Sequence, residues 1–128
     1  MLHKIACDKA HAIGKKVYLT CNTLPRNEEI SQFEGFIKEV EGTGVDAVIA
    51  NDIGVFSLIK KYTPDMEIHI STQAGIVNYV TANEFYNMGA KRVVLAREMS
   101  FDEIKEIREK IPSDMEIEAF VHGAMCIS

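Results

Sequence analysis

The chain has 128 residues, of which 47% are hydrophobic and 26% charged. This composition suits one globular domain and excludes disordered and fibrous proteins. Fourteen basic and nineteen acidic side chains give a net charge of −5, so the chain lacks the basic surface that nonspecific nucleic-acid binding requires. We therefore expect a single domain over residues 1–128 that does not bind nucleic acid nonspecifically.

The cysteines and the apolar runs indicate where the protein resides. Cys7, Cys21 and Cys126 are an odd number at wide spacing, which argues against a secreted disulfide framework and for a reducing compartment. No apolar run approaches the roughly 20 residues that a membrane-spanning helix needs, and charged residues interrupt residues 1–14 where a signal peptide would be apolar. We predict a cytoplasmic protein without a membrane partner.

Short β-branched runs alternate along the chain with helical patterns, which predicts an α/β protein with parallel strands joined by helices. The first helix is expected to bury Leu2, Ile5 and Ile13. The predicted strands cover residues 17–21, 46–50, 67–70, 92–96 and 116–121, and the predicted helices cover residues 1–13, 27–42, 55–62, 78–88 and 100–111.

Capping residues set the starts of these helices. Asn27 is expected to cap the second helix, and Ser100 with Glu103 forms a capping box at the last one. No strand precedes the first helix and no helix follows the last strand. Such repeated units suit either an open doubly wound sheet or a (β/α)8 barrel. The ends favour an incomplete barrel of about five strands, as though taken from a longer one.

Polar residues follow each predicted strand, at the end where parallel α/β folds bind ligands. Loops are polar in any protein, but all five strands share this feature, so we predict a pocket there. The candidate substrate-binding residues are Asn22, Asp52, His69, Ser71 and Gln73.

Four further residues are candidates for catalysis. Arg97 and Glu98 follow one strand directly, where they could hold an anion and move a proton or form an ion pair at the rim. Glu118 and His122 are an even number of residues apart, so on a regular strand they share a face. A functional site and a structural salt bridge both explain a carboxylate in that position.

The common catalytic motifs, among them GxSxG, HExxH, GxGxxG and CxxC, are missing from the sequence. Cys126 has two interpretations. It is a nucleophile with His122 as its base, or it is one ligand of a metal or iron–sulfur site whose other thiolates lie beyond Ser128.

Several motifs resemble those of the collagenase-like peptidase family of unknown catalytic type. Residues 118–126, EAFVHGAMC, are similar to its signature, and IHISTQ at 68–73, VVLARE at 93–98 and GVDAVI at 44–49 agree with it in order. The resemblance implies a (β/α)8 barrel, of which this chain runs from the second helix to the seventh strand. Such a piece would expose strand edges that favour a homo-oligomer.

The resemblance implies two activities for a longer parent protein. Some members of the family are described as peptidases, and a peptidase acting on a peptide substrate is our main interpretation. The alternative is an accessory factor that hydroxylates RNA bases or ubiquinone precursors and holds a 4Fe-4S cluster, whose first cysteine matches Cys126. A third interpretation is a piece of barrel without activity of its own.

Overall fold

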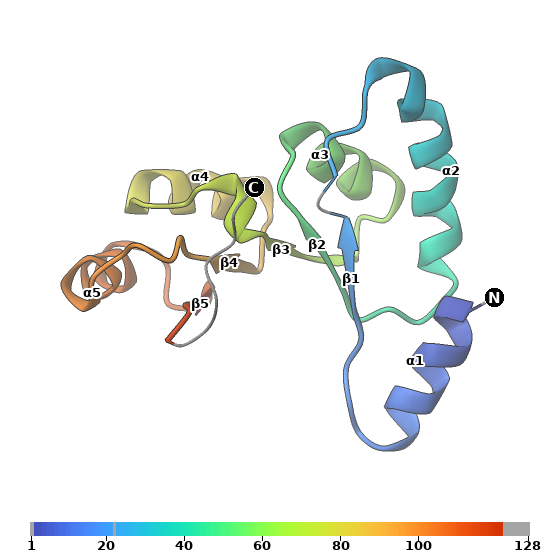
Figure 1. Ribbon diagram of the computed structural model, residues 1–128, viewed down its shortest axis with the longest axis horizontal. Coiled ribbons are helices and arrows are strands. Elements are labelled where there is room, and N and C mark those ends of the chain that lie inside the picture. The colour runs from blue at the N-terminus through green and yellow to red at the C-terminus, as the bar shows by residue number, and fades with distance from the viewer. Residues whose placement is uncertain (1, 22, 122–128) are drawn as a thin grey trace. The chain divides into compact units, whose positions relative to one another are not determined.

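The computed structural model describes residues 2–21 and 23–121. Helices and strands alternate through them in the order α1 (Leu2–Ala12), β1 (Tyr18–Cys21), η1 (Asn27–Glu29), α2 (Ile30–Glu41), β2 (Ala47–Ala50), α3 (Ile53–Tyr62), β3 (Glu67–Ile70), η2 (Thr72–Ala74), α4 (Tyr79–Met88), β4 (Arg92–Val94), α5 (Phe101–Lys110) and β5 (Glu116–Glu118) (Figure 1). The pairs β1–β2, β3–β4 and β4–β5 are all parallel. The predicted α/β class with five parallel strands is confirmed.

The chain divides into two compact units, Met1–Ile68 and His69–Ser128. The first contains α1 to α3 with β1 and β2, and the second contains α4 and α5 with β4 and β5. The division falls within β3. The single domain expected from the length stays a prediction.

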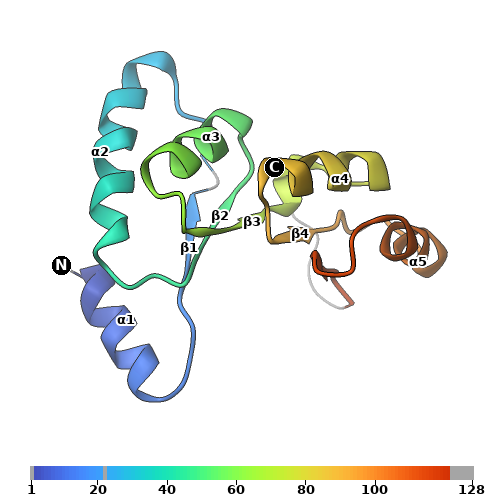
Figure 2. The same ribbon diagram turned by 180° about the vertical axis from the view of Figure 1, so that it is seen from behind.

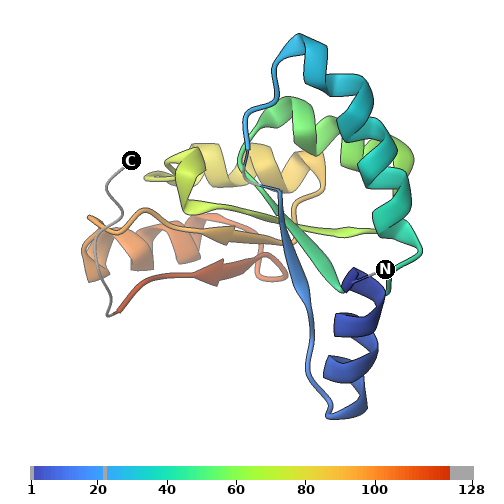
Figure 3. The same cartoon turned by 45° about the vertical axis from the view of Figure 1, so that its right-hand side comes forward.

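In the first unit, α2 and α3 pack against each other and cover one face of the β1–β2 pair (Figure 3). Cys21 and Val48 on that face meet Ile37 of α2 and Ile59 of α3, and all four side chains are buried. Tyr18 lies on the opposite face of the pair and is partly exposed. Helices α2 and α3 thus bury the apolar side chains on one face of the β1–β2 pair.

Helix α1 differs from its prediction. Leu2, Ile5 and Ile13 are exposed, and Cys7 is its buried residue, so the expected inward face is wrong. Cys7 packs on the turn at Gly44, which has φ +87° and where a Cβ would lie 3.6 Å from the Cβ of Cys7. His11, one helical turn after Cys7, contacts Asp46 at 2.8 Å, so this side of α1 faces the fold and the larger apolar side chains face solvent.

The helix starts are mostly those predicted. Asn78 and Ser100 accept hydrogen bonds from Thr81 N and Glu103 N at the starts of α4 and α5, and the capping box of Ser100 is complete. Asn27 is not a cap. It is the first residue of η1, and at this start Glu29 accepts a hydrogen bond from Arg26 N instead, at 2.7 Å.

The second unit holds a short parallel sheet with α4 and α5 beside it (Figure 2). The two helices pack against each other, and Leu95, Ile107 and Met115 are buried in this unit's core. Strands β4 and β5 are shorter than predicted, yet Leu95 N donates a hydrogen bond of 2.9 Å to Glu118 O beyond the end of β4. The backbone is thus still held where the chain leaves these strands.

Candidate functional site

In the first unit, Asp52 follows β2 and has a structural role. Its carboxylate accepts a hydrogen bond from Val55 N at 3.0 Å and so caps α3. A half-buried carboxylate at a helix N-terminus is stabilised by the helix dipole as well as by this bond. Asn22, the other substrate-binding residue predicted in this unit, lies outside the described residues.

Three of the predicted residues lie at the end of β3. His69 and Ser71 are buried, and Gln73 is exposed. Ser71 accepts a hydrogen bond from Gln73 N at 3.3 Å and caps η2, which ends at Gly75 in the left-handed region. Ser71 therefore shapes the loop, and His69 is part of the wall behind it.

Glu118 is exposed, and its carboxylate lies 3.4 Å from the Arg92 guanidinium. Arg92 also binds Glu116 at 2.6 Å, and parallel register places Arg92 beside Glu116 and Val94 beside Glu118. The guanidinium lowers the pKa of Glu116. Glu118 therefore forms a salt bridge in the structure. The functional role predicted for Glu118 with His122 stays a prediction, because His122 lies outside the described residues.

Arg97 and Glu98 follow β4, as expected. The Arg97 guanidinium carbon lies 4.2 Å from the centre of the Phe120 ring, within the range of a cation–π contact. Glu98 is exposed. Arg97 thus lies against an aromatic ring from the segment that follows β5.

An apolar hollow of about 220 Å³ lies beside this pair, and we call it the apolar hollow. It is lined by Met99, Phe101, Ile104, Ala119, Phe120 and Val121. The sequence analysis predicted a pocket among polar residues at this end of the strands, and it named none of these apolar residues as candidates. The signal that could have found it is Phe101, a large apolar side chain directly after the capping residue, where a helix usually meets solvent.

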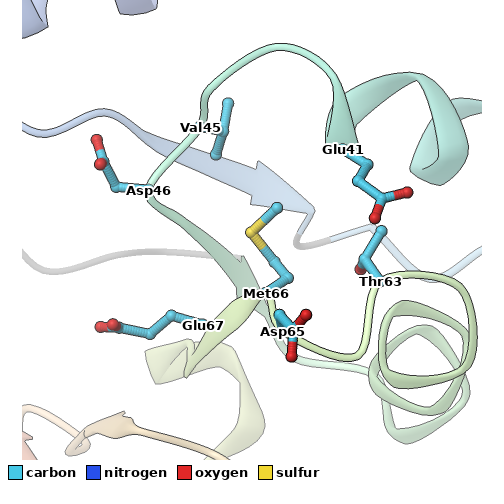
Figure 4. Close-up of a pocket in the computed structure, with 7 residues that line it drawn as sticks. All are labelled: Glu41, Val45, Asp46, Thr63, Asp65, Met66 and Glu67. Atoms are coloured by element: carbon cyan, nitrogen blue, oxygen red, sulfur yellow. The ribbon is translucent and has the colours of Figure 1, made fainter.

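A second hollow, of about 310 Å³, lies in the first unit at the amino ends of β2 and β3 (Figure 4). We call it the acidic hollow. It is lined by Glu41, Val45, Asp46, Thr63, Asp65, Met66 and Glu67. In Figure 4 the four carboxylates spread in different directions and do not converge on one point. Across residues 2–21 and 23–121, no group of three or more His, Cys, Asp or Glu residues is placed to hold a metal ion.

Asp46 of the acidic hollow is already bound within the fold. It accepts a hydrogen bond from Val17 N at 2.6 Å, and the same oxygen lies 2.8 Å from His11 Nε2 of α1. The bond to His11, followed by the bond to Val17 N, lowers the pKa of Asp46. This carboxylate ties α1 and the start of β1 to the start of β2.

The described cysteines do not suit an iron–sulfur cluster. Cys7 and Cys21 are both buried, and burial raises the pKa of Cys21 to about 11 and raises that of Cys7. A cluster ligand is a thiolate, so neither side chain fits that role. Cys126 lies outside the described residues, and the cluster predicted through it stays a prediction.

No helix in the described part of the chain is long and apolar enough to span a membrane.

A comparison with known families tests the resemblance that the sequence motifs indicated. The model of peptidase family U32 matches residues 3–128. The chain belongs to peptidase family U32. The solved structure of the U32 peptidase Mk0906 matches this U32 chain with a TM-score of 0.75 and 16% identity, covering 91% of this chain and 50% of that one. This likeness concerns the fold, and it is consistent with part of a barrel.

Curated U32 relatives carry two kinds of name. The tRNA hydroxylation protein P of Escherichia coli is 44% identical over 98% of this chain, and the 23S rRNA 5-hydroxycytidine C2501 synthase of the same organism is 36% identical over 93%. An uncharacterized protease of Methanocaldococcus jannaschii is 39% identical over 93%. This U32 chain spans 27% of the first relative, 18% of the second and 29% of the third.

Proposed function

We propose that this chain is part of a U32 protein that takes part in the hydroxylation of RNA bases. The observation that carries the proposal is the 44% identity, over 98% of the chain, to tRNA hydroxylation protein P of Escherichia coli. The rRNA 5-hydroxycytidine synthase supports the same substrate class. These relatives favour the alternative activity over our main interpretation, a peptidase. The cytoplasmic location predicted from the cysteines belongs to the same proposal.

The described cysteines do not distinguish the two functions. Cys7 and Cys21 are buried with raised pKa values, so they suit neither a nucleophile nor a cluster ligand. The support for this choice comes from the apolar hollow. An enzyme acting on an RNA base must bind that base apart from its stacked neighbours, and the apolar hollow beyond the ends of β4 and β5 offers an apolar surface for it. Arg97, Glu98 and Glu118 remain our candidates for holding charge or moving a proton beside it.

A peptidase remains the second candidate function because of the relative in Methanocaldococcus jannaschii. The two are separated by deleting the gene in its own organism and measuring hydroxylated nucleosides in digested tRNA and rRNA by mass spectrometry. We expect one hydroxylated nucleoside to fall at least tenfold and to return when the gene is restored.

The matched assay for a peptidase uses the protein produced from the same gene, with gelatin and a mixed peptide library as substrates. We expect no cleavage above a heat-treated sample. Unchanged nucleosides in the deletion strain, together with cleavage by the protein, would reverse the choice between the two functions.

A further inference from the structure

Large apolar side chains line the apolar hollow and are exposed to solvent, although proteins usually bury such side chains. Phe101 is 83% exposed, Val121 89% and Phe120 43%. These three side chains line one hollow together with Met99, Ile104 and Ala119. Grouped exposure of large apolar side chains marks a site where something binds.

The second observation concerns the flat side-chain groups at the apolar hollow. The Arg97 guanidinium lies over the Phe120 ring at 4.2 Å, and Phe101 adds a second ring to the same hollow. Flat aromatic and guanidinium surfaces are the groups on which proteins stack unpaired RNA bases. At about 220 Å³, the hollow is smaller than the roughly 300–1,000 Å³ of pockets for drug-sized ligands, so it suits one ring system.

The surroundings of the hollow are held in place. Leu95 N donates to Glu118 O at 2.9 Å and Ala96 N donates to Ile76 O at 3.1 Å, which fixes the segment before Arg97. Ser100 and Glu103 fix the start of α5 beside Phe101. A surface ordered before binding avoids part of the entropy cost of ordering it afterwards.

The lining of the hollow indicates which part of a nucleotide it takes. All its lining residues are apolar, Arg97 beside it lies over the Phe120 ring, and the whole chain carries −5. A phosphate gains little from such a surface, whereas a neutral base is buried by it. Duplex RNA presents phosphates and buries its bases, so a site of this kind selects an unpaired base.

Resting on the proposed function, we infer that the apolar hollow binds one unstacked RNA base. The base lies against Phe101 and the exposed part of Phe120, while Arg97 supports the Phe120 ring.

Photochemical crosslinking tests this inference on the full chain. A short oligouridine with 4-thiouridine at its centre is bound and irradiated, and crosslinked peptides are identified by mass spectrometry. We expect the crosslink at Phe101 or Phe120. Phe101→Ala should lower its yield on the order of tenfold or more, in line with the loss of one base–aromatic stack. Val80→Ala, which removes an exposed apolar side chain of α4 outside the hollow, is the matched control and should leave the yield unchanged.

Two further measurements separate a base from a phosphate. Arg97→Lys keeps the positive charge and loses the flat guanidinium, so it should lower the yield if the base stacks here and preserve it if Arg97 binds phosphate. An abasic oligonucleotide of equal length should compete at least tenfold less well than the oligouridine. Equal competition, a crosslink confined to other residues, or no crosslink at all overturns the inference.

The outcomes also separate this inference from the proposed function. A crosslink elsewhere, with hydroxylated nucleosides still lost in the deletion strain, overturns the base site and leaves the function standing. Unchanged nucleosides overturn the function whatever the crosslink shows. Dimerisation that Phe101→Ala abolishes, without an RNA crosslink, assigns the hollow to a second copy of the chain and overturns the inference.

Discussion

The acidic hollow of the first unit and the apolar hollow of the second unit differ in their lining and in the ends of their own strands that they adjoin. The acidic hollow, at the amino ends, is lined by four carboxylates, and Asp46 among them is bound to Val17 and His11. The apolar hollow, at the carboxyl ends, is lined by apolar side chains that remain exposed. The acidic hollow is larger, yet its chemistry serves the fold. In α/β folds the carboxyl end is where ligands bind.

The largest expected effect is on the free energy of unfolding. It distinguishes buried apolar side chains, which stabilise the fold, from the exposed ones that line the hollow. Leu95 is fully buried near the hollow, whereas Phe101 is exposed within it. Leu95→Ala should lower the free energy of unfolding by about 2–5 kcal/mol, and Phe101→Ala by less than about 0.5 kcal/mol. Urea unfolding followed by circular dichroism measures both. A large loss from Phe101→Ala would mean that this ring belongs to the core.

The next effect concerns Asp46 in the acidic hollow. Asp46→Ala removes the acceptor of Val17 N and the partner of His11, which should lower the free energy of unfolding by about 1–3 kcal/mol. The variant should still crosslink the oligouridine as the natural chain does. A variant with unchanged stability and lost RNA crosslinking would place function at the amino ends of the strands.

The pH dependence of this difference has a definite sign. Because the pKa of Asp46 is lowered in the folded protein, its contribution is fully present above the ordinary carboxyl pKa of about 3.9. It is lost as the pH falls through the lower pKa of the folded state. The stability gap between the natural chain and Asp46→Ala should therefore be constant near neutral pH and shrink in acid. A gap that widens in acid contradicts the assigned role.

A smaller effect is expected at the start of α5, which supports the apolar hollow. Ser100→Ala removes the hydrogen bond from Glu103 N and should cost about 1 kcal/mol of stability, whereas Ser100→Asp keeps an acceptor and should cost less. Thermal unfolding compares the two. Ser100→Ala should also lower the crosslink yield, because Phe101 becomes less ordered when the cap is lost. An equal loss of stability in both variants would show that capping does not hold this segment.

The smallest effect is expected at Asp65, whose side chain lines the acidic hollow and is exposed. Asp65→Ala should change the free energy of unfolding by no more than about 0.5 kcal/mol and leave RNA crosslinking unchanged. This variant is the reference for the acidic hollow as Val80→Ala is for the apolar one. A clear loss of crosslinking would show that the acidic hollow takes part in binding.

Much of the fold was predictable because local patterns specify it. The apolar runs before Asn51 and after Lys91 form β2 and β4, and the capping box at Ser100 starts α5. The inward face of α1 was not predictable, because the turn at Gly44 that selects Cys7 lies far along the chain. The bond between His11 and Asp46 joins residues 35 apart and leaves no local pattern.

The candidate site was less predictable, for a chemical reason. Asp and Ser residues that follow strands can bind ligands or cap the next helix, and the sequence does not distinguish these roles. Asp52 and Ser71 are caps in the structure. The apolar hollow was missed because Phe101 and Phe120 resemble core residues in the sequence, and only packing leaves them exposed.

The most direct test restores the gene to the deletion strain in three forms and measures hydroxylated nucleosides in total RNA. The forms are the natural sequence, Asp65→Ala, and the double variant Phe101→Ala with Phe120→Ala, with protein levels checked by immunoblot. The natural sequence and Asp65→Ala should restore the hydroxylated nucleoside, and the double variant should not. Full restoration by the double variant, or no change on deleting the gene, would contradict the assignment of RNA-base hydroxylation to the apolar hollow.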